Sequence, residues 1–238
     1  LWPNIEAALE WIDRSGDIDG DGLIKYSRKE AAGLYNQGWK DSYDSIYHAD
    51  GRCARLPIAL CEVQGYVYSA RKEAANIARA LGHEDRAREL EQQAEKLRQL
   101  VEERFWSDEL GFYAIAIDGS GKPCLVRSSN AGHLLFCGLP SPERARKVAD
   151  ALLGPSFFSG WGIRTIATTE PRYSPISYHN GSIWPHDNAL IALGLARYGL
   201  EDHVMKLFKG LFDTATAMDL RRLPELFCGF KRHPGNRP

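Results

Sequence analysis

Apolar residues recur at helical spacing along most of the chain. The segment 84–105 is the most regular, with apolar side chains three or four positions apart on one face and charged residues elsewhere, which is typical of a helix with one buried face. A longer pattern begins at Pro57 and runs to Leu81, where Gly82 is expected to end it. The same spacing predicts further helices over residues 3–14, 130–138, 142–153, 184–198 and 201–217.

Two short stretches have strand character instead. They are Phe112–Ile117 and Cys124–Arg127, and the sequence Asp118-Gly119-Ser120-Gly121 between them is rich in turn formers. This arrangement predicts a small β-hairpin inserted among the helices.

The predicted helices come in pairs, joined by short connections or by long loops rich in Gly, Trp and Tyr. Paired antiparallel helices indicate either a solenoid or a closed α/α toroid. A solenoid repeats its sequence at a fixed period, and this chain has no such repeat. Unusual residues concentrate in the loops at 33–48, 158–187 and 221–233, an arrangement expected of an enzyme that carries functional groups on loops over a rigid scaffold.

Composition and charge narrow the class of partner. The 238 residues are 44% hydrophobic, and 30 basic residues against 31 acidic ones give a formal charge of −1. We therefore expect no nucleic-acid partner and no membrane partner. Five cysteines with no close pair predict free thiols in a reducing, cytoplasmic compartment. The first residues lack the features of a signal peptide.

The first stretch with candidate chemistry is Tyr35–Asp44. It packs an indole, a glycine, amides and carboxylates into ten residues. Flat aromatic faces can stack on sugar rings while amides and carboxylates bond the hydroxyl groups, so Trp39 and Asp41 are candidates for a sugar site. The alternative is a helix start capped by Asp41 or Ser42.

The second stretch is Tyr178–Asp187, which opens the predicted helix at 184–198. Helix capping does not require Tyr178, His179, Asn180 or Trp184. A nucleophilic triad is disfavoured because no Ser or Cys elbow accompanies the His/Asp pair. A zinc site is disfavoured because the HExxH spacing is missing.

Two further loops carry candidates. Glu225 lies among apolar and aromatic neighbours in Arg221–Phe230, a setting that tends to raise a carboxyl pKa and favour proton transfer. Its alternative is an ion pair with Arg221 or Arg222. Trp161 stands between two glycines, where it can either meet a ligand or fill a tight turn as a buried indole.

An acidic loop at Asp17–Gly22 resembles the start of an EF-hand calcium site. The position of the closing bidentate glutamate holds Arg28 instead. We therefore predict a polar turn here, and no metal or organic cofactor for the protein.

Six stretches together resemble the bacterial amylo-α-1,6-glucosidase family, which is related to the C-terminal glucosidase domain of glycogen debranching enzymes. The resemblance implies an inverting glycoside hydrolase that acts on an oligosaccharide or polysaccharide, with Asp41 as general acid and Glu225 as general base. It further implies a sugar subsite lined by Trp39, Lys40, Glu62, Gln64, Trp161, His179, Asn180 and Trp184, although Glu62 and Gln64 can equally be polar positions on a barrel helix. The matching stretches are GDIDGDGLIKY (16–26), NQGWKDS (36–42), CEVQGY (61–66), SGWGIRT (159–165), YHNGSIWPHD (178–187) and RLPELFCGF (222–230).

The family fold is all-α, an (α/α)6 toroid of twelve helices like the six-hairpin glycosidases. The periodicity predicts about seven, so we expect residues 1–238 to form part of one α/α-barrel catalytic domain, without its first and last helices. An open barrel can self-associate. Two alternatives stay open: a related α-glycosidase acting on trehalose, glucosylglycerate or mannosides, and a non-catalytic carbohydrate-binding or scaffold fragment.

Overall fold

The computed structural model describes residues 1–238, which form seven α-helices and five short strands. No helix is long and apolar enough to cross a membrane. The helices are α1 (Trp2–Ser15), α2 (Cys61–Ala80), α3 (Glu84–Arg104), α4 (Asn130–Cys137), α5 (Pro142–Leu152), α6 (Pro185–Arg197) and α7 (Glu201–Ala217), with a 3-10 turn η1 (Asp219–Arg221). The strands are β1 (Ala59–Leu60), β2 (Trp106–Ser107), β3 (Phe112–Tyr113), β4 (Ala116–Ile117) and β5 (Pro123–Cys124).

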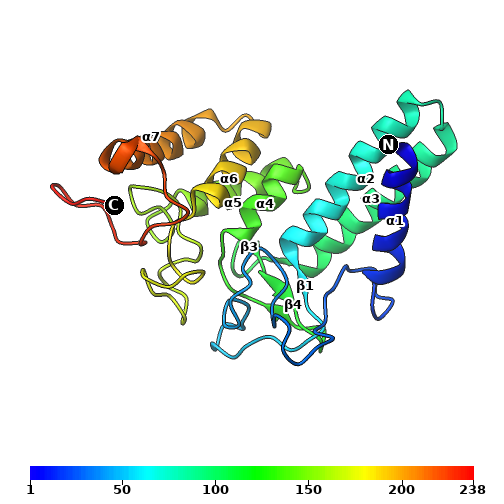
Figure 1. Ribbon diagram of the computed structural model, residues 1–238, viewed down its shortest axis with the longest axis horizontal. Helices are drawn as coiled ribbons and strands as arrows, with labels where there is room; N and C mark the ends of the chain where they lie inside the picture. Colours follow the sequence, from blue (N-terminus) through cyan, green and yellow to red (C-terminus); the bar gives the residue numbers. More distant parts are fainter.

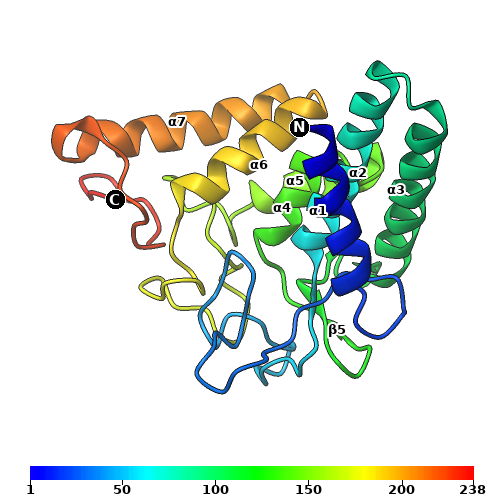
Figure 2. The ribbon, with the colours of Figure 1, turned by 45° about the vertical axis from the view of Figure 1, so that its right-hand side comes forward.

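Six of the helices form three consecutive hairpins. Helix α2 packs on α3, α4 on α5, and α6 on α7, while α4 also packs against both α2 and α6. The helices α2, α4 and α6 therefore form an inner layer, and their partners lie behind them (Figures 1 and 2). The prediction of a mainly helical, α/α-type fold with a small hairpin is confirmed.

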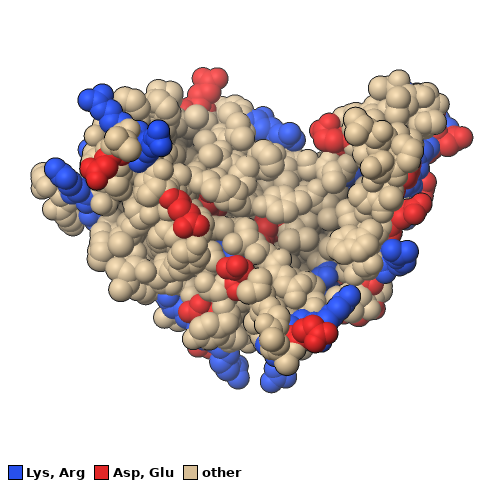
Figure 3. All heavy atoms as spheres, viewed as in Figure 1, with Lys and Arg blue, Asp and Glu red and all other residues tan.

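The hairpin of α2 and α3 projects from the rest of the molecule. The surface is hollowed between this hairpin and the other helices, as the space-filling view in Figure 3 shows. Acidic and basic side chains are interspersed over this face, and no continuous basic patch lies on it. This mixture of signs agrees with the formal charge of −1.

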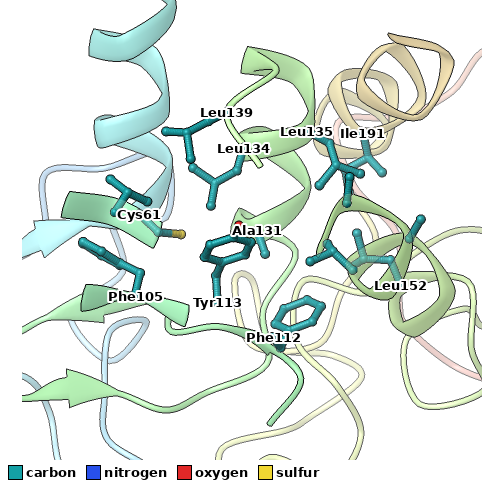
Figure 4. Packing of buried hydrophobic residues seen from close by; sticks show 14 of the residues in the cluster. Cys61, Phe105, Phe112, Tyr113, Ala131, Leu134, Leu135, Leu139, Leu152 and Ile191 are labelled. Atoms are coloured by element: carbon teal, nitrogen blue, oxygen red, sulfur yellow. The ribbon is translucent and has the colours of Figure 1, made fainter. Parts of the chain in front are cut away.

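The main core lies between the three hairpins. Figure 4 shows apolar side chains from α4 and α6 meeting those around β3 and the start of α2. Helices α4 and α6 approach closely because Gly194 has no side chain: a Cβ there would lie 2.5 Å from the backbone nitrogen of Phe136. This close contact lies in the last turns of the two helices, and their first turns meet through His133 and Asp187.

Two sequence predictions are corrected. Residues 57–60 do not begin a helix, because Ala59 and Leu60 pair with Ile117 and Ala116 as the antiparallel strand β1, and α2 begins at Cys61. The predicted strand at 112–117 is two strands. Its first half, β3, pairs with β2, and its second half, β4, lies between β1 and β5.

Helices α2, α4 and α6 all begin on the side where the long loops gather, at the bottom of Figure 1. Pro185 at the first helical position starts α6, and α4 ends at Gly138, whose φ of 69° suits a residue without a Cβ. The loops at 16–58, 155–184 and 218–238 therefore meet at the N-terminal ends of the inner helices.

Candidate active site

Trp39 lies at the centre of an aromatic cluster on the loop side of the inner helices. Its ring stacks on His133 with centroids 5.6 Å apart and meets His179 and Trp184 edge-on at 5.7 and 5.8 Å. His179 and Trp184 stack on each other at 5.2 Å, and Tyr178 meets both edge-on. We call Trp39, His133, Tyr178, His179 and Trp184 the aromatic cluster.

Asp41 follows Trp39 on a loop held by buried hydrogen bonds. The amide of the fully buried Asn36 donates to the carbonyl of Ser42 at 2.7 Å and accepts from the hydroxyl of Tyr26 at 2.8 Å. The Ser45 hydroxyl donates to the carbonyls of Lys40 and Ser42. The Asp41 side chain is 51% exposed, and its Oδ1 lies 3.8 Å from Nδ1 of His179. It does not act as a helix cap, because no helix begins at this loop.

His179 is buried beside Asp41. The Ser42 hydroxyl lies 2.8 Å from its Nδ1, and the Ser42 backbone N–H donates to the same atom at 3.4 Å. Burial, followed by the nearby Lys40 ammonium, lowers the pKa of His179 to about 4. His179 is therefore neutral at neutral pH.

Glu225 lies on the C-terminal loop and is exposed. The loop pairs with the start of α6 through two backbone bonds: Ile183 N–H donates to Phe227 O at 2.8 Å, and Phe227 N–H donates to Ile183 O at 3.0 Å. Gly229 passes so close to Gly181 that a Cβ at Gly229 would lie 1.8 Å from the Gly181 carbonyl oxygen. Glu225 makes no ion pair with Arg221 or Arg222, and its Oε1 accepts a bond from the Tyr178 hydroxyl at 3.1 Å.

Tyr178 is the residue that connects the two candidate carboxylates. Desolvation first, then the hydrogen bond and charge of Glu225, then the charge of Asp41 raise its pKa. Its ring also lies 4.7 Å from that of His179, the residue beside Asp41. The structure therefore brings Asp41 and Glu225, which are 184 positions apart in the sequence, to one aromatic cluster.

Lys40 and Gln64 do not face the open surface. Lys40 is 1% exposed, and its Nζ donates to the carbonyl of Thr165 at 2.6 Å. Gln64 is fully buried; its amide donates to the carbonyls of Ile24 and Leu60 and accepts from Ile24 N–H. Both donors of Gln64 are thus used by the backbone, and the side chain braces the loop before α2.

Glu62, Trp161 and Asn180 are also largely buried. Glu62 lies in the first turn of α2, where burial raises its pKa. Trp161 is 5% exposed and packs against Ile183 and Phe227 beneath the Glu225 loop. Asn180 donates to the carbonyl of Asp44 at 3.2 Å, which ties the Tyr178 loop to the Asp41 loop. Trp184 uses its indole N–H on the carbonyl of Tyr178 at 2.8 Å and so offers only its ring face.

A group of buried polar side chains lies under Trp39, and the sequence pattern did not predict it. His133 on α4 lies between the Tyr66 hydroxyl and Asp187, whose Oδ1 is 2.8 Å from its Nε2. All three side chains come from the first two turns of the inner helices. The available signal was the presence of polar residues among apolar ones where these helices begin. Helical periodicity alone does not reveal such residues, because it identifies a buried face by its apolar positions.

The acidic loop near the N-terminus has a lysine at its centre. Carboxylate oxygens of Asp17, Asp19 and Asp21 lie within 4.8 Å of one another. The Lys25 ammonium bonds to Asp19 and lies 2.8 Å from Asp21 Oδ1, so its positive charge offsets part of the negative charge of the cluster.

Three consecutive helix hairpins, with inner helices that all begin on the side of the long loops, are an arrangement of the (α/α)6 type. The sequence profile of the mannosylglycerate hydrolase MGH1-like glycoside hydrolase domain matches residues 1–225. The chain belongs to this family. The resemblance to amylo-α-1,6-glucosidases thus identified a related group of (α/α)6 glycosidases, but it did not identify the family, and nothing in these matches points to glycogen debranching.

Individual relatives agree with the family. The chain is 30% identical over 142 residues to a mannosylglycerate hydrolase of Rubrobacter radiotolerans, a match that covers 58% of this chain and 32% of that enzyme. It is 32% identical over 98 residues to a mannosylglycerate hydrolase of Thermus thermophilus, covering 41% of this chain and 23% of that enzyme. The chain therefore matches about a third or less of the length of these curated relatives.

Solved structures support the fold. The crystal structure of a GH63 mannosylglycerate hydrolase from Thermus thermophilus in complex with Tris superposes with a TM-score of 0.73 at 18% identity, over 99% of this chain and 67% of that chain. The neutral trehalase of Saccharomyces cerevisiae gives 0.66 at 17% identity, over 79% and 37% of the two chains. At these identities the likeness concerns the fold alone.

Proposed function

We propose that this chain forms the central part of a catalytic domain that hydrolyses an α-glycosidic bond with inversion, with Asp41 as general acid and Glu225 as general base. The observation that carries the proposal is that both carboxylates lie at one aromatic cluster, Asp41 beside His179 and Glu225 bonded to the neighbouring Tyr178. Both side chains are exposed, and neither is held in an ion pair with a lysine or arginine. They are therefore free to exchange protons with a bound substrate.

The chemistry requires two carboxyl groups with opposite tasks. The protonated acid releases the leaving-group oxygen, while the ionised base activates a water molecule on the opposite face of the sugar. Inverting enzymes hold the two groups about 6.5–9.5 Å apart to leave room for that water. Two carboxylates suffice for this reaction, so we propose that it needs no metal or organic cofactor.

The aromatic cluster is suited to hold the sugar between the two carboxylates. Trp39 and Trp184 meet at 80°, which forms a corner of two ring faces. A pyranose can stack its C–H face on one indole and present its edge to the other. The buried Asn180 and Lys40 stabilise this corner from behind rather than contacting the sugar.

The substrate class we favour is an α-linked mannosyl or glucosyl group on a small acidic acceptor. The curated relatives are mannosylglycerate hydrolases, and one solved relative is a complex with Tris and D-glycerate. An α-1,6-linked oligosaccharide is the second candidate, and it rests on the sequence resemblance alone. Self-association of the chain is a separate prediction that sedimentation of the purified protein would test.

Asp41→Asn and Glu225→Gln test the assignment. Each change keeps the shape of the side chain and removes its proton chemistry, so we expect kcat to fall about a thousandfold or more, equivalent to about 4 kcal/mol in the barrier. The measurement is hydrolysis of mannosylglycerate, glucosylglycerate, trehalose and an α-1,6 disaccharide by the intact protein, with the first product anomer followed by NMR.

Matched controls are Asp44→Asn, on the acid loop, and Asp219→Asn, just before the base loop. Both should retain most of the activity. Near-normal turnover by Asp41→Asn or Glu225→Gln would remove that residue from the mechanism. Sugar binding without any hydrolysis in the unaltered protein would favour a non-catalytic carbohydrate-binding role.

A further inference from the structure

Lys40 points away from the residues on either side of it. Trp39 belongs to the aromatic cluster and the Asp41 side chain is 51% exposed, whereas Lys40 is 1% exposed. Its ammonium lies 5.0 Å from the Trp39 ring centroid, on the buried side of the loop. A substrate on the open face would contact Asp41 without reaching Lys40.

The bond from Lys40 joins the Asp41 loop to Thr165, a residue that is itself bonded to two other segments. The Thr165 carbonyl that accepts from Nζ at 2.6 Å also accepts from Ser129 N–H at 2.9 Å, just before α4. Thr165 in turn donates its N–H to the Ser182 carbonyl and accepts from Gly181 N–H through Oγ1 at 2.8 Å. One residue thus connects the acid loop, the start of α4 and the Tyr178 loop.

Lys40 also carries a positive charge that acts on two buried acids. Glu62 and Asp187, in the first turns of α2 and α6, are both fully buried, and their Oε1 and Oδ2 atoms have no protein hydrogen-bond partner. Both carboxylates favour the charged form of Lys40, although burial is the larger effect and lowers its pKa to about 8. Removing this ammonium would take away one positive charge that acts on both buried carboxyl groups, although Asp187 would keep its bond to His133.

Lys40 further acts on His179. To accept from Ser42 N–H, Nδ1 of His179 must carry no proton, because a charged imidazole donates from both nitrogens. Besides Lys40, the charged groups that face His179 are Asp41, Asp44 and Asp187, and all three favour the protonated ring. Without the lysine charge, only burial would oppose the effect of these acids on His179.

We propose that Lys40 is a positioning residue for Asp41. Its ammonium fixes the Asp41 loop on Thr165 and, together with burial, favours the neutral form of His179, whose Nδ1 holds the Ser42 backbone next to Asp41. The inference rests on the proposed role of Asp41 as general acid. In this proposal Lys40 holds the Asp41 loop from its buried side and does not contact the sugar.

The first test reads His179 directly, without catalysis. Side-chain nitrogen NMR of the intact protein, with the His179 signals assigned by their loss in His179→Gln, should find the ring neutral with its proton on Nε2 down to about pH 5. In Lys40→Met, whose stem is similar but uncharged, the midpoint of the His179 titration should rise by about one pH unit or more. Lys40→Arg should titrate like the unaltered protein.

Lys25→Met is the matched control, because Lys25 is also a buried lysine bonded to acids but is not among the groups facing His179. It should leave the His179 titration unchanged. A proton on Nδ1 in the unaltered protein would overturn the proposal even if Lys40→Met fails to fold. An unchanged titration in a folded Lys40→Met would overturn it as well.

The second test is kinetic. Lys40→Met should lower kcat at least tenfold with KM changed less than threefold, and the acid limb of the pH profile of kcat should move to higher pH. A purely structural role would reduce the amount of active protein without moving that limb. The two proposals fail separately: full activity of Asp41→Asn would refute the acid assignment, while the NMR titration would still report the coupling of Lys40 to His179.

Discussion

The two loops that carry the candidate carboxylates are held in place by different forces. The Asp41 loop is fixed by buried polar bonds, from Asn36 and Ser45 within the loop and from Lys40 to Thr165. The Glu225 loop is fixed by a backbone pair between Phe227 and Ile183, by the packing of Phe227 on Trp161, and by bonds to Gly229 further along. Side-chain hydrogen bonds thus hold the Asp41 loop next to its carboxylate, whereas next to Glu225 the loop is held by a backbone pair and an apolar contact.

The difference has consequences for precision and for tolerance. Buried hydrogen bonds have narrow geometry and are costly to leave unmade, so the Asp41 loop is held in one conformation at several points. An apolar contact is less directional, so Glu225 can shift more easily around its anchor. The bond from the Tyr178 hydroxyl is the one hydrogen bond to the Glu225 side chain, and it joins Glu225 to the aromatic cluster beside Asp41. Three substitutions separate these contributions.

Phe227→Ala should have the largest effect. The ring is 6% exposed, and truncating a buried phenylalanine costs about 3–5 kcal/mol in unfolding free energy, with the lower end expected for a small satellite cluster. Chemical denaturation measures this loss. Hydrogen exchange at Ile183 N–H should accelerate as the loop separates, while exchange at the Asp41 loop stays slow.

The control is Phe212→Ala on α7, where the ring is 56% exposed and the cost should stay below about 1 kcal/mol. Equal losses for both phenylalanines would mean that no apolar anchor exists at the Glu225 loop.

Asn36→Ala should come second. It leaves the Tyr26 hydroxyl without its partner and removes one of the donors to the Ser42 carbonyl, which keeps its bonds from Ser45. An unsatisfied buried group costs about 1–3 kcal/mol. We expect a lower melting temperature and a fall in kcat, because Ser42 adjoins the acid. Gln37→Ala, which removes a neighbouring exposed amide, should be close to neutral. A neutral Asn36→Ala would show that the polar network does not hold the loop.

Tyr178→Phe should have the smallest effect. The hydroxyl is part of a 46% exposed residue, so the lost bond is worth about 1 kcal/mol or less. We therefore expect a loss of up to about fivefold in kcat/KM, with stability unchanged. Tyr43→Phe, 73% exposed and without a hydroxyl bond to the site, should have no effect on the kinetics. A loss of a hundredfold or more at Tyr178 would mean that this hydroxyl contacts the substrate as well.

Much of the fold could be predicted because helical periodicity is local. Helices α3 to α7 begin and end within about one residue of their predicted bounds, since the 3.6-residue pattern is read within a single element. The strand β1 was missed because its partner, β4, lies 58 positions away, counted from Ala59 to Ile117. Apolar residues directly before a helix fit its periodic pattern, and nothing nearby in the sequence indicates that they pair with a distant strand.

The candidate site was predictable only in part, for a related reason. Residue type and neighbourhood pointed to Asp41, Glu225, Trp39 and Trp184, but the direction of Lys40 and the bonds of Gln64 depend on backbone groups elsewhere. His133 was hidden because one polar residue in an apolar helix start gives no periodic signal.

By itself, the sequence determined which segments are helices, which loops carry the carboxylates and aromatic rings, and to which group of glycosidases the chain is related. Those properties follow from local spacing and from residue chemistry. Only the tertiary structure decided that Asp41 and Glu225 lie at one aromatic cluster and that Lys40 lies behind the Asp41 loop. The physical reason is that close packing of the inner helices, and not any neighbour along the chain, brings these loops together.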